Sequence, residues 1–177
     1  GVLWGAVAAT TIATAFLVGH ARSRRALEAA WKYVALGSVG VAIAFLGIVL
    51  LYAATLAAGT PTLSWSQLST AGLPLDPSLV TVAGALAVLG FATKAGLAPV
   101  HSWLPDAHSQ APAPVSGLMS GVLLSVAFYA ILRVQAVVDP VVGPGLMRGM
   151  LVTAGFKDTL EIAQERIGYT GPLPVIA

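Results

Sequence analysis

Long apolar runs joined by short polar connections set the pattern of this chain. Between residues 33 and 75, and again between 77 and 93, the sequence carries no charged side chain. A helix needs about 20 mostly apolar residues to cross the hydrocarbon core of a bilayer. Four segments approach or exceed that length, at residues 2–18, 31–58, 79–98 and 115–138. The pattern therefore predicts an all-α membrane protein with about four transmembrane helices.

One stretch, "KAGLAPVHSWLPDAHSQAPAPVS" at residues 94–116, interrupts this pattern with polar groups and helix breakers. Proline lacks the backbone N–H of a helix and kinks or ends it. We therefore expect the third span to end at a proline-rich break. Backbone groups freed inside a membrane must be buried in protein or line a wet cavity; the alternative is an ordinary loop at the membrane surface. The four prolines of this break are Pro99, Pro105, Pro112 and Pro114.

Composition supports the membrane interpretation and excludes several classes of function. Hydrophobic residues make up 57% of the chain and charged residues 9%, against roughly 25% charged residues in soluble domains. The absence of cysteine excludes disulfides and iron–sulfur clusters. There is no glycine-rich phosphate loop and no paired nucleophile and base. The chain begins at Gly1 without a charged leader, which favours a segment of a longer parent over a signal peptide.

Basic residues predict the orientation of the spans. Arg22, Arg24, Arg25 and Lys32 cluster after the first segment, and such clusters favour the cytoplasmic side. We therefore expect a multi-pass protein with loops 21–30 and 99–114 in the cytoplasm. From residue 156 the sequence becomes polar, so we divide it into a membrane domain, 1–155, and a polar tail, 156–177.

Lys94 is the first candidate for chemistry, because it lies inside the third apolar segment just before the break. An ionisable residue within a span is a functional hypothesis by default. Removal from water disfavours the charged ammonium, so a buried lysine can exchange its proton near neutral pH. The alternative is that the side chain extends to the cytoplasmic headgroups.

Three further titratable groups, His101, Asp106 and His108, lie on the break. Histidine changes charge near neutral pH, so the pair could pass protons from the cytoplasm to Lys94. Asp106 could instead cap a short helix. Haem or metal ligation by the histidines is the competing interpretation, although two histidines with one carboxylate match no zinc motif. We predict no bound metal and no cofactor.

Other polar positions fit helix packing or a polar relay. Glu28 and Lys32 have the i,i+4 spacing of a helical ion pair. Ser120 could bridge a water on the fourth span. Small residues recur every third or fourth position in two stripes, which predicts close approach of neighbouring helices. One stripe contains Gly37, Gly40, Ala44 and Gly47, and the other contains Ala113, Gly117, Gly121 and Ser125.

Two longer motifs carry a family resemblance. "ALEAAWKY" (26–33) and "TKAGLAPVHSWLPDAHSQAPAPVSGLMSGVLLSVAFYAILR" (93–133) closely resemble the antiporter-like membrane subunits of group 4 membrane-bound hydrogenases, of the formate hydrogenlyase and hydrogenase 4 type. These are related to the proton-pumping subunits of complex I and to Mrp antiporters. The resemblance implies a fragment of a fourteen-helix fold with inverted repeats. It places Lys94 on a central proton-carrying lysine, Lys32 on a lysine of the preceding helix, and Ser120 on a later polar relay position.

The chain departs from this family at two places. Where the family usually carries a glutamate in a pattern like "WVAVEATT", this chain reads "WGAVAATT", with Ala8 at the acidic position. After "RGMLVTAG" (148–155) the family continues with a further membrane helix, which "FKDTLEIAQERIGYTG" replaces here. The usual acidic partner of Lys94 is therefore missing.

The resemblance implies a proton- or cation-translocating subunit in the inner (plasma) membrane. Its expected partners are other membrane subunits, a peripheral hydrogenase or dehydrogenase arm, and the lipid bilayer, with no nucleic acid. No redox site is expected in this chain itself. Two alternatives stay open: a membrane anchor for haem or quinone, and a truncated remnant that does not transport.

Overall fold

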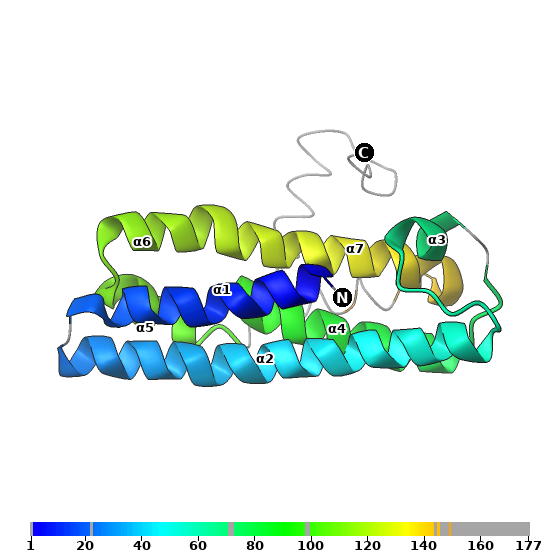
Figure 1. Ribbon diagram of the computed structural model, residues 1–177, viewed down its shortest axis with the longest axis horizontal. Coiled ribbons are helices and arrows are strands. Elements are labelled where there is room, and N and C mark those ends of the chain that lie inside the picture. The colour runs from blue at the N-terminus through cyan, green and yellow to red at the C-terminus, as the bar shows by residue number, and fades with distance from the viewer. Residues whose placement is uncertain are drawn as a thin grey trace.

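A computed structural model describes residues 2–21, 23–70, 73–97 and 100–143, together with Gly145 and Gly149. Four long helical segments lie side by side along the long axis of the molecule (Figure 1). They are α1 (Val2–Val18), α2 (Arg24–Ala57), α4 (Pro77–Ala95), and a fourth segment formed by α6 (Ala113–Leu118), a π-helical turn (Met119–Leu123) and α7 (Leu124–Val142). All regular structure in this described part is helical, as predicted.

Three of these segments are long and apolar enough to cross a membrane, among the residues described: Arg24–Ala57, Pro77–Ala95 and Ala113–Val142. The apolar helix α1 is shorter, with 17 residues, and its bounds agree with the predicted first span. The second span begins at Arg24 rather than near residue 31. The Ser23 side chain accepts a hydrogen bond from the Ala26 N–H at 3.0 Å, and such a cap starts a helix where the polar residues begin.

Short helices occupy two of the connections. α3 (Trp65–Thr70) lies between the predicted second and third spans. α5 (Trp103–Gln110) lies within the proline-rich stretch, at the opposite end of the bundle from α3 (Figure 1). A three-residue 3-10 turn (Gly19–Ala21) follows α1.

In the described residues, the break after Lys94 is made by glycine. Gly96 has a positive φ of 70° and caps the C-terminus of α4, a conformation that glycine adopts without steric cost. Pro99 lies outside the described residues. The three later prolines belong to the first turns of helices: Pro105 lies in the first turn of α5, Pro112 is the residue before α6, and Pro114 lies in its first turn. They begin helices instead of breaking them, because proline suits a first turn.

The last helix runs further than the sequence suggests. The sequence predicts a fourth span over 115–138, yet α7 continues through Pro140 to Val142. Gly143, with φ 91°, follows its end. The boundary predicted at Gly155 and the polar tail, 156–177, lie outside the described residues.

The closest helix pair is α2 with α4, and glycine permits it. A Cβ added to Gly47 would lie 2.5 Å from the Ala87 backbone nitrogen, and one added to Gly90 would overlap the Gly40 carbonyl and the Ala44 backbone. The predicted packing of the 37–47 stripe is therefore present. The second stripe behaves differently, because a Cβ added to Gly117 or Gly121 would meet nothing within 4 Å in the described structure. Packing of a helix against this stripe stays a prediction.

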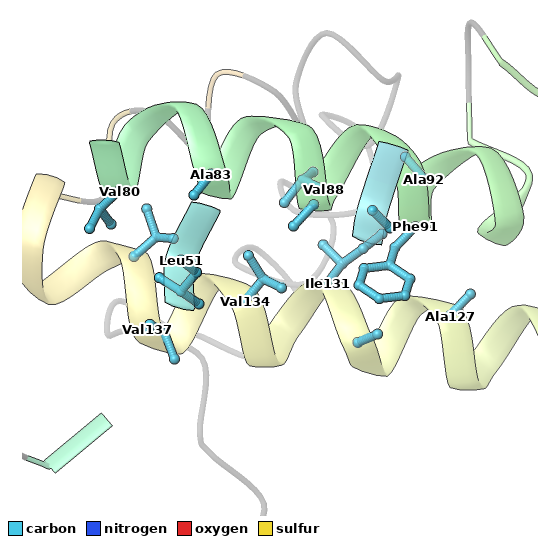
Figure 2. Packing of buried hydrophobic residues seen from close by; sticks show 14 of the residues in the cluster. Leu51, Val80, Ala83, Val88, Phe91, Ala92, Ala127, Ile131, Val134 and Val137 are labelled. Carbon is cyan, nitrogen blue, oxygen red and sulfur yellow. The ribbon is translucent and has the colours of Figure 1, made fainter. Parts of the chain in front are cut away.

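The larger hydrophobic core lies between α4 and α7, with α2 alongside. Figure 2 shows Val88, Phe91, Ile131 and Val134 pointing into the space between the two helices. A second, smaller cluster contains Tyr33, Trp103 and Met119. It joins α2, α5 and the π-helical turn at the end of the bundle where α4 stops, and there the titratable residues gather.

Candidate proton site

Lys94 lies in the last turn of α4 with its side chain inside the protein. It is 2% exposed, and the whole last turn is buried because α2 packs closely against α4. The ammonium Nζ donates a hydrogen bond to the Tyr33 hydroxyl at 2.5 Å. It also lies 4.4 Å from the centroid of the Tyr33 ring, a cation–π distance. No carboxylate of the described residues forms a salt bridge with Lys94.

The Tyr33 hydroxyl continues the contact toward α1. It lies 2.6 Å from Thr14 Oγ1, and Thr14 Oγ1 donates to the Thr10 carbonyl at 2.6 Å. Tyr33 is 1% exposed and Thr14 is 4% exposed. Three helices thus contribute to one buried chain of polar atoms that begins at Lys94 and ends on the backbone of α1.

Trp103 covers this chain from α5. Its indole Nε1 donates to the Thr93 carbonyl at 2.8 Å, one of the carbonyls that lose helical partners near the end of α4. Its ring lies 5.0 Å from the Tyr33 ring, and Met119 of the π-helical turn belongs to the same cluster. The break after α4 therefore folds back and covers Lys94 with an aromatic side chain.

A second group of charges lies nearer the surface, between α2 and α5. Lys32 Nζ contacts Glu28 Oε1 at 2.7 Å and Asp106 Oδ2 at 3.0 Å. The Glu28–Lys32 pair is the one that the spacing predicts. The Asp106 contact was not predicted, and it corrects the capping interpretation, because α5 begins at Trp103 and Asp106 lies inside it. These charges border a polar cleft of about 150 Å³, lined by Arg25, Glu28, Ala29, Lys32, Asp106, Ser109 and Gln110.

The two histidines of the break differ in their surroundings. His108 Nδ1 lies 2.6 Å from Ser116 Oγ, so this contact joins α5 to α6. His101 is exposed. Ser120, on the π-helical turn, donates its hydroxyl to the Ser116 carbonyl at 2.9 Å and is exposed. Among the described residues, no three His, Asp or Glu side chains are grouped closely enough to hold a metal ion.

The structure thus groups the candidate residues into three sets: Lys94 with Tyr33, Lys32 with Asp106, and His108 with Ser116. No hydrogen bond or ion pair between described residues connects Lys94 directly to His101, Asp106 or His108. Sequence reasoning missed Tyr33, Thr14 and Trp103. Two signals were available: Tyr33 directly follows Lys32 in an apolar helix, and α1 carries three threonines, at positions 10, 11 and 14, in an apolar sequence.

The ion pair between α2 and α5 yields a prediction. Replacing Asp106 by asparagine should loosen α5, because it removes the one salt bridge between described residues that joins the two helices. Exposed ion pairs contribute little, so amide hydrogen exchange in residues 103–110 should rise only about two- to five-fold. Mass spectrometry of the exchanged protein measures this. Ser109→Ala, on the same helix and exposed, is the control. Equal exchange in both variants would show that the Lys32–Asp106 salt bridge does not hold α5 against α2.

A bundle of apolar helices with a lysine buried beside a helix break defines a class of integral membrane protein with an ionisable group inside its fold. The chain belongs to the NADH:quinone oxidoreductase/Mrp antiporter transmembrane family, which it matches over residues 2–156. This confirms the resemblance stated from the two sequence motifs.

Three relatives show the extent of the likeness. A hydrogenase-4 component F homolog of Methylacidiphilum infernorum is 40% identical over 158 residues, covering 87% of this chain and 33% of that protein. The membrane-bound sulfane sulfur reductase, an archaeal respiratory membrane complex, contains a chain that superposes with a TM-score of 0.75 at 28% identity, covering 85% of this chain and 30% of that one. Respiratory complex I of Thermus thermophilus gives 0.61 at 34% identity, covering 73% and 28%. The chain spans about a third of the length of these relatives.

Proposed function

We propose that this chain translocates protons as a membrane subunit of a hydrogenase-like or NADH:quinone oxidoreductase-like complex, with Lys94 as the residue that takes up and releases the proton. The observation that carries the proposal is a lysine that is 2% exposed in an apolar helix and has no carboxylate partner in the described structure. An uncompensated charge in such a place is costly. Small changes in neighbouring charge therefore suffice to move the lysine between its two protonation states.

The proton would reach Lys94 from the cytoplasmic end of the bundle. Lys32, Asp106, His101 and His108 all lie on the segments next to the α4 terminus, and the polar cleft opens beside Lys32. Water could connect these groups where no direct contact joins them. Ser120, on the π-helical turn, would be a polar relay position. In this arrangement loops 21–30 and 99–114 face the cytoplasm, and the membrane is the inner, or plasma, membrane.

The driving energy would come from partner subunits. The relatives named above are components of respiratory membrane complexes or hydrogenases. We propose that redox chemistry in a peripheral hydrogenase or dehydrogenase arm changes the charge near the cytoplasmic end of the bundle and thereby discharges Lys94. Residues 1–155 would form the membrane domain that receives this signal, in contact with other membrane subunits and lipid.

Transport by the parent complex tests the proposal. The complex containing this chain is reconstituted into sealed vesicles with a pH indicator inside, and electron transfer is started with the donor. We expect a pH change inside the vesicles that a protonophore abolishes and that persists in sodium-free buffer. Electron transfer at a normal rate without any pH change would contradict proton translocation; a pH change that requires sodium would identify a cation exchanger instead.

A further inference from the structure

The buried hydroxyls beside Lys94 have a role of their own. We propose that Tyr33 is a positioning residue for Lys94 and that Tyr33 and Thr14 form a hydrogen-bond switch that satisfies the lysine in both of its protonation states. The inference rests on the proposed function for its purpose, but its evidence is the geometry of three side chains on α4, α2 and α1. All three are buried, and their amine and hydroxyl groups contact one another.

When Lys94 is charged, the hydrogen bonds of this group all run from Lys94 toward α1. An ammonium has three donors and no acceptor, so Lys94 Nζ donates to the Tyr33 oxygen. The Tyr33 hydroxyl donates to Thr14 Oγ1 at 2.6 Å, and Thr14 donates to the Thr10 carbonyl. A backbone carbonyl has no proton to pass on. This series of hydrogen bonds therefore stabilises the charge on Lys94 and does not conduct its proton away.

In the neutral state the same atoms can pair in the reverse direction. An amine nitrogen has a lone pair, and rotation of the Tyr33 hydroxyl lets it donate to Lys94 Nζ. The Thr14 hydroxyl then turns from the Thr10 carbonyl to the Tyr33 oxygen, since either oxygen can be the donor in that contact. The Thr10 carbonyl keeps its helical partner, the N–H four residues on. Two hydroxyl rotations therefore keep Lys94, Tyr33 and Thr14 hydrogen-bonded to one another in both states, without movement of heavier atoms.

A carboxylate would serve the two states less equally. An ionised carboxylate only accepts hydrogen bonds, so it stabilises the charged lysine and leaves the neutral amine with a poorer partner. The chain has Ala8 on α1 at the position where its family resemblance leads one to expect an acid. A hydroxyl that donates as readily as it accepts makes the two states of Lys94 more equal in free energy, which suits a group that must be loaded and discharged.

Other charges around the site belong to separate pairs. α1 carries no titratable side chain within Val2–Val18. On α2, Arg24 and Arg25 are exposed in the first turn. Glu28 and Lys32 of α2 pair with each other, and Lys32 also pairs with Asp106 of α5; His108 contacts Ser116. On α7 the charged residues are Arg133, which contacts Tyr129, and Asp139, which contacts Gln135. Tyr33 is the one side chain that the described structure places in hydrogen-bond contact with the Lys94 ammonium.

Nitrogen NMR of the chain in lipid bilayers tests the switch directly. The chain has three lysines, at positions 32, 94 and 157, so ¹⁵Nζ labelling gives few signals, and Lys94→Arg assigns the one of interest. Tyr33→Phe removes the hydrogen bond of both states, but the bond from the charged ammonium is the stronger of the two, so the charged form loses more. We therefore expect the pH at which half of Lys94 is charged to fall by about one unit. Thr14→Val should shift it less, in the same direction, and Thr14→Ser should restore the wild-type value.

Tyr52→Phe is the matched control, because Tyr52 is an exposed tyrosine on the same helix. A Lys94 midpoint unchanged by both Tyr33→Phe and Thr14→Val, in protein with native helix content and an unshifted Lys32 signal, would overturn the switch. If Tyr33→Phe fails to fold, Thr14→Val with its serine counterpart carries the test alone. The titration needs no transport, so a shifted midpoint would stand even if Lys94 proved dispensable for pumping.

Discussion

Replacing Lys94 by methionine is expected to abolish proton translocation in the parent complex, at least ten-fold below wild type. Methionine keeps the length and packing of the side chain in a site that is 2% exposed, but it cannot carry a proton. Lys94→Arg should fail equally, because a guanidinium stays protonated and cannot release its proton. The initial rate of the pH change in reconstituted vesicles, divided by the rate of electron transfer, measures the loss.

A second cation in an apolar helix supplies the control for this experiment. Arg133 lies on α7 and contacts Tyr129 rather than the buried site. Arg133→Met removes a positive charge from a membrane helix in the same way, and it should leave the ratio of protons to electrons unchanged. Normal pumping by Lys94→Met would contradict the proposed function, and the interpretation as a non-transporting remnant would then be favoured.

The sequence was sufficient to predict a helical membrane protein and to place Lys94 at the end of an apolar helix, just before a break. Both depend on strong signals: uncharged runs longer than a bilayer requires, and a single lysine placed against such a run. The helix bounds were less predictable, because a cap such as Ser23 extends α2 into polar sequence, while Gly96 stops α4 before the proline that seemed to end it. Hydropathy alone predicts neither the Ser23 cap nor the helix end at Gly96.

The contacts of the site could not be predicted, because they are made between helices far apart in sequence. Tyr33 and Lys94 are 61 positions apart, and Lys32 and Asp106 are 74 apart. The sequence left Asp106 as either a proton-transfer group or a helix cap, and only the return of α5 across α2 shows its partner. Prolines raised the same difficulty: Pro112 and Pro114 suit a helix start as well as a break, and the choice depends on where the chain turns.

Replacing Gly90 by leucine is expected to prevent α2 and α4 from packing, with loss of folded protein. Even one added carbon at Gly90 would overlap backbone atoms of Gly40 and Ala44, which cannot move aside as a flexible side chain would. Forcing atoms into a packed core typically costs about 1–3 kcal/mol and sometimes more, and we expect more than about 3 kcal/mol here because the obstacle is backbone. Lys94 lies one turn beyond Gly90, so the Tyr33 contact should be lost as well.

Graded substitutions separate packing from helix propensity. Gly90→Ala and Gly47→Ala should already destabilise the bundle, although alanine favours a helix over glycine by about 1 kcal/mol. Gly5→Leu on α1 is the control, since an added Cβ there meets nothing within 4 Å. Loss of helical circular dichroism during titration with denaturing detergent measures each variant. Equal midpoints for Gly90→Leu and Gly5→Leu would show that α2 and α4 do not approach as closely as the glycines indicate, and the placement of Tyr33 against Lys94 would then lose its support.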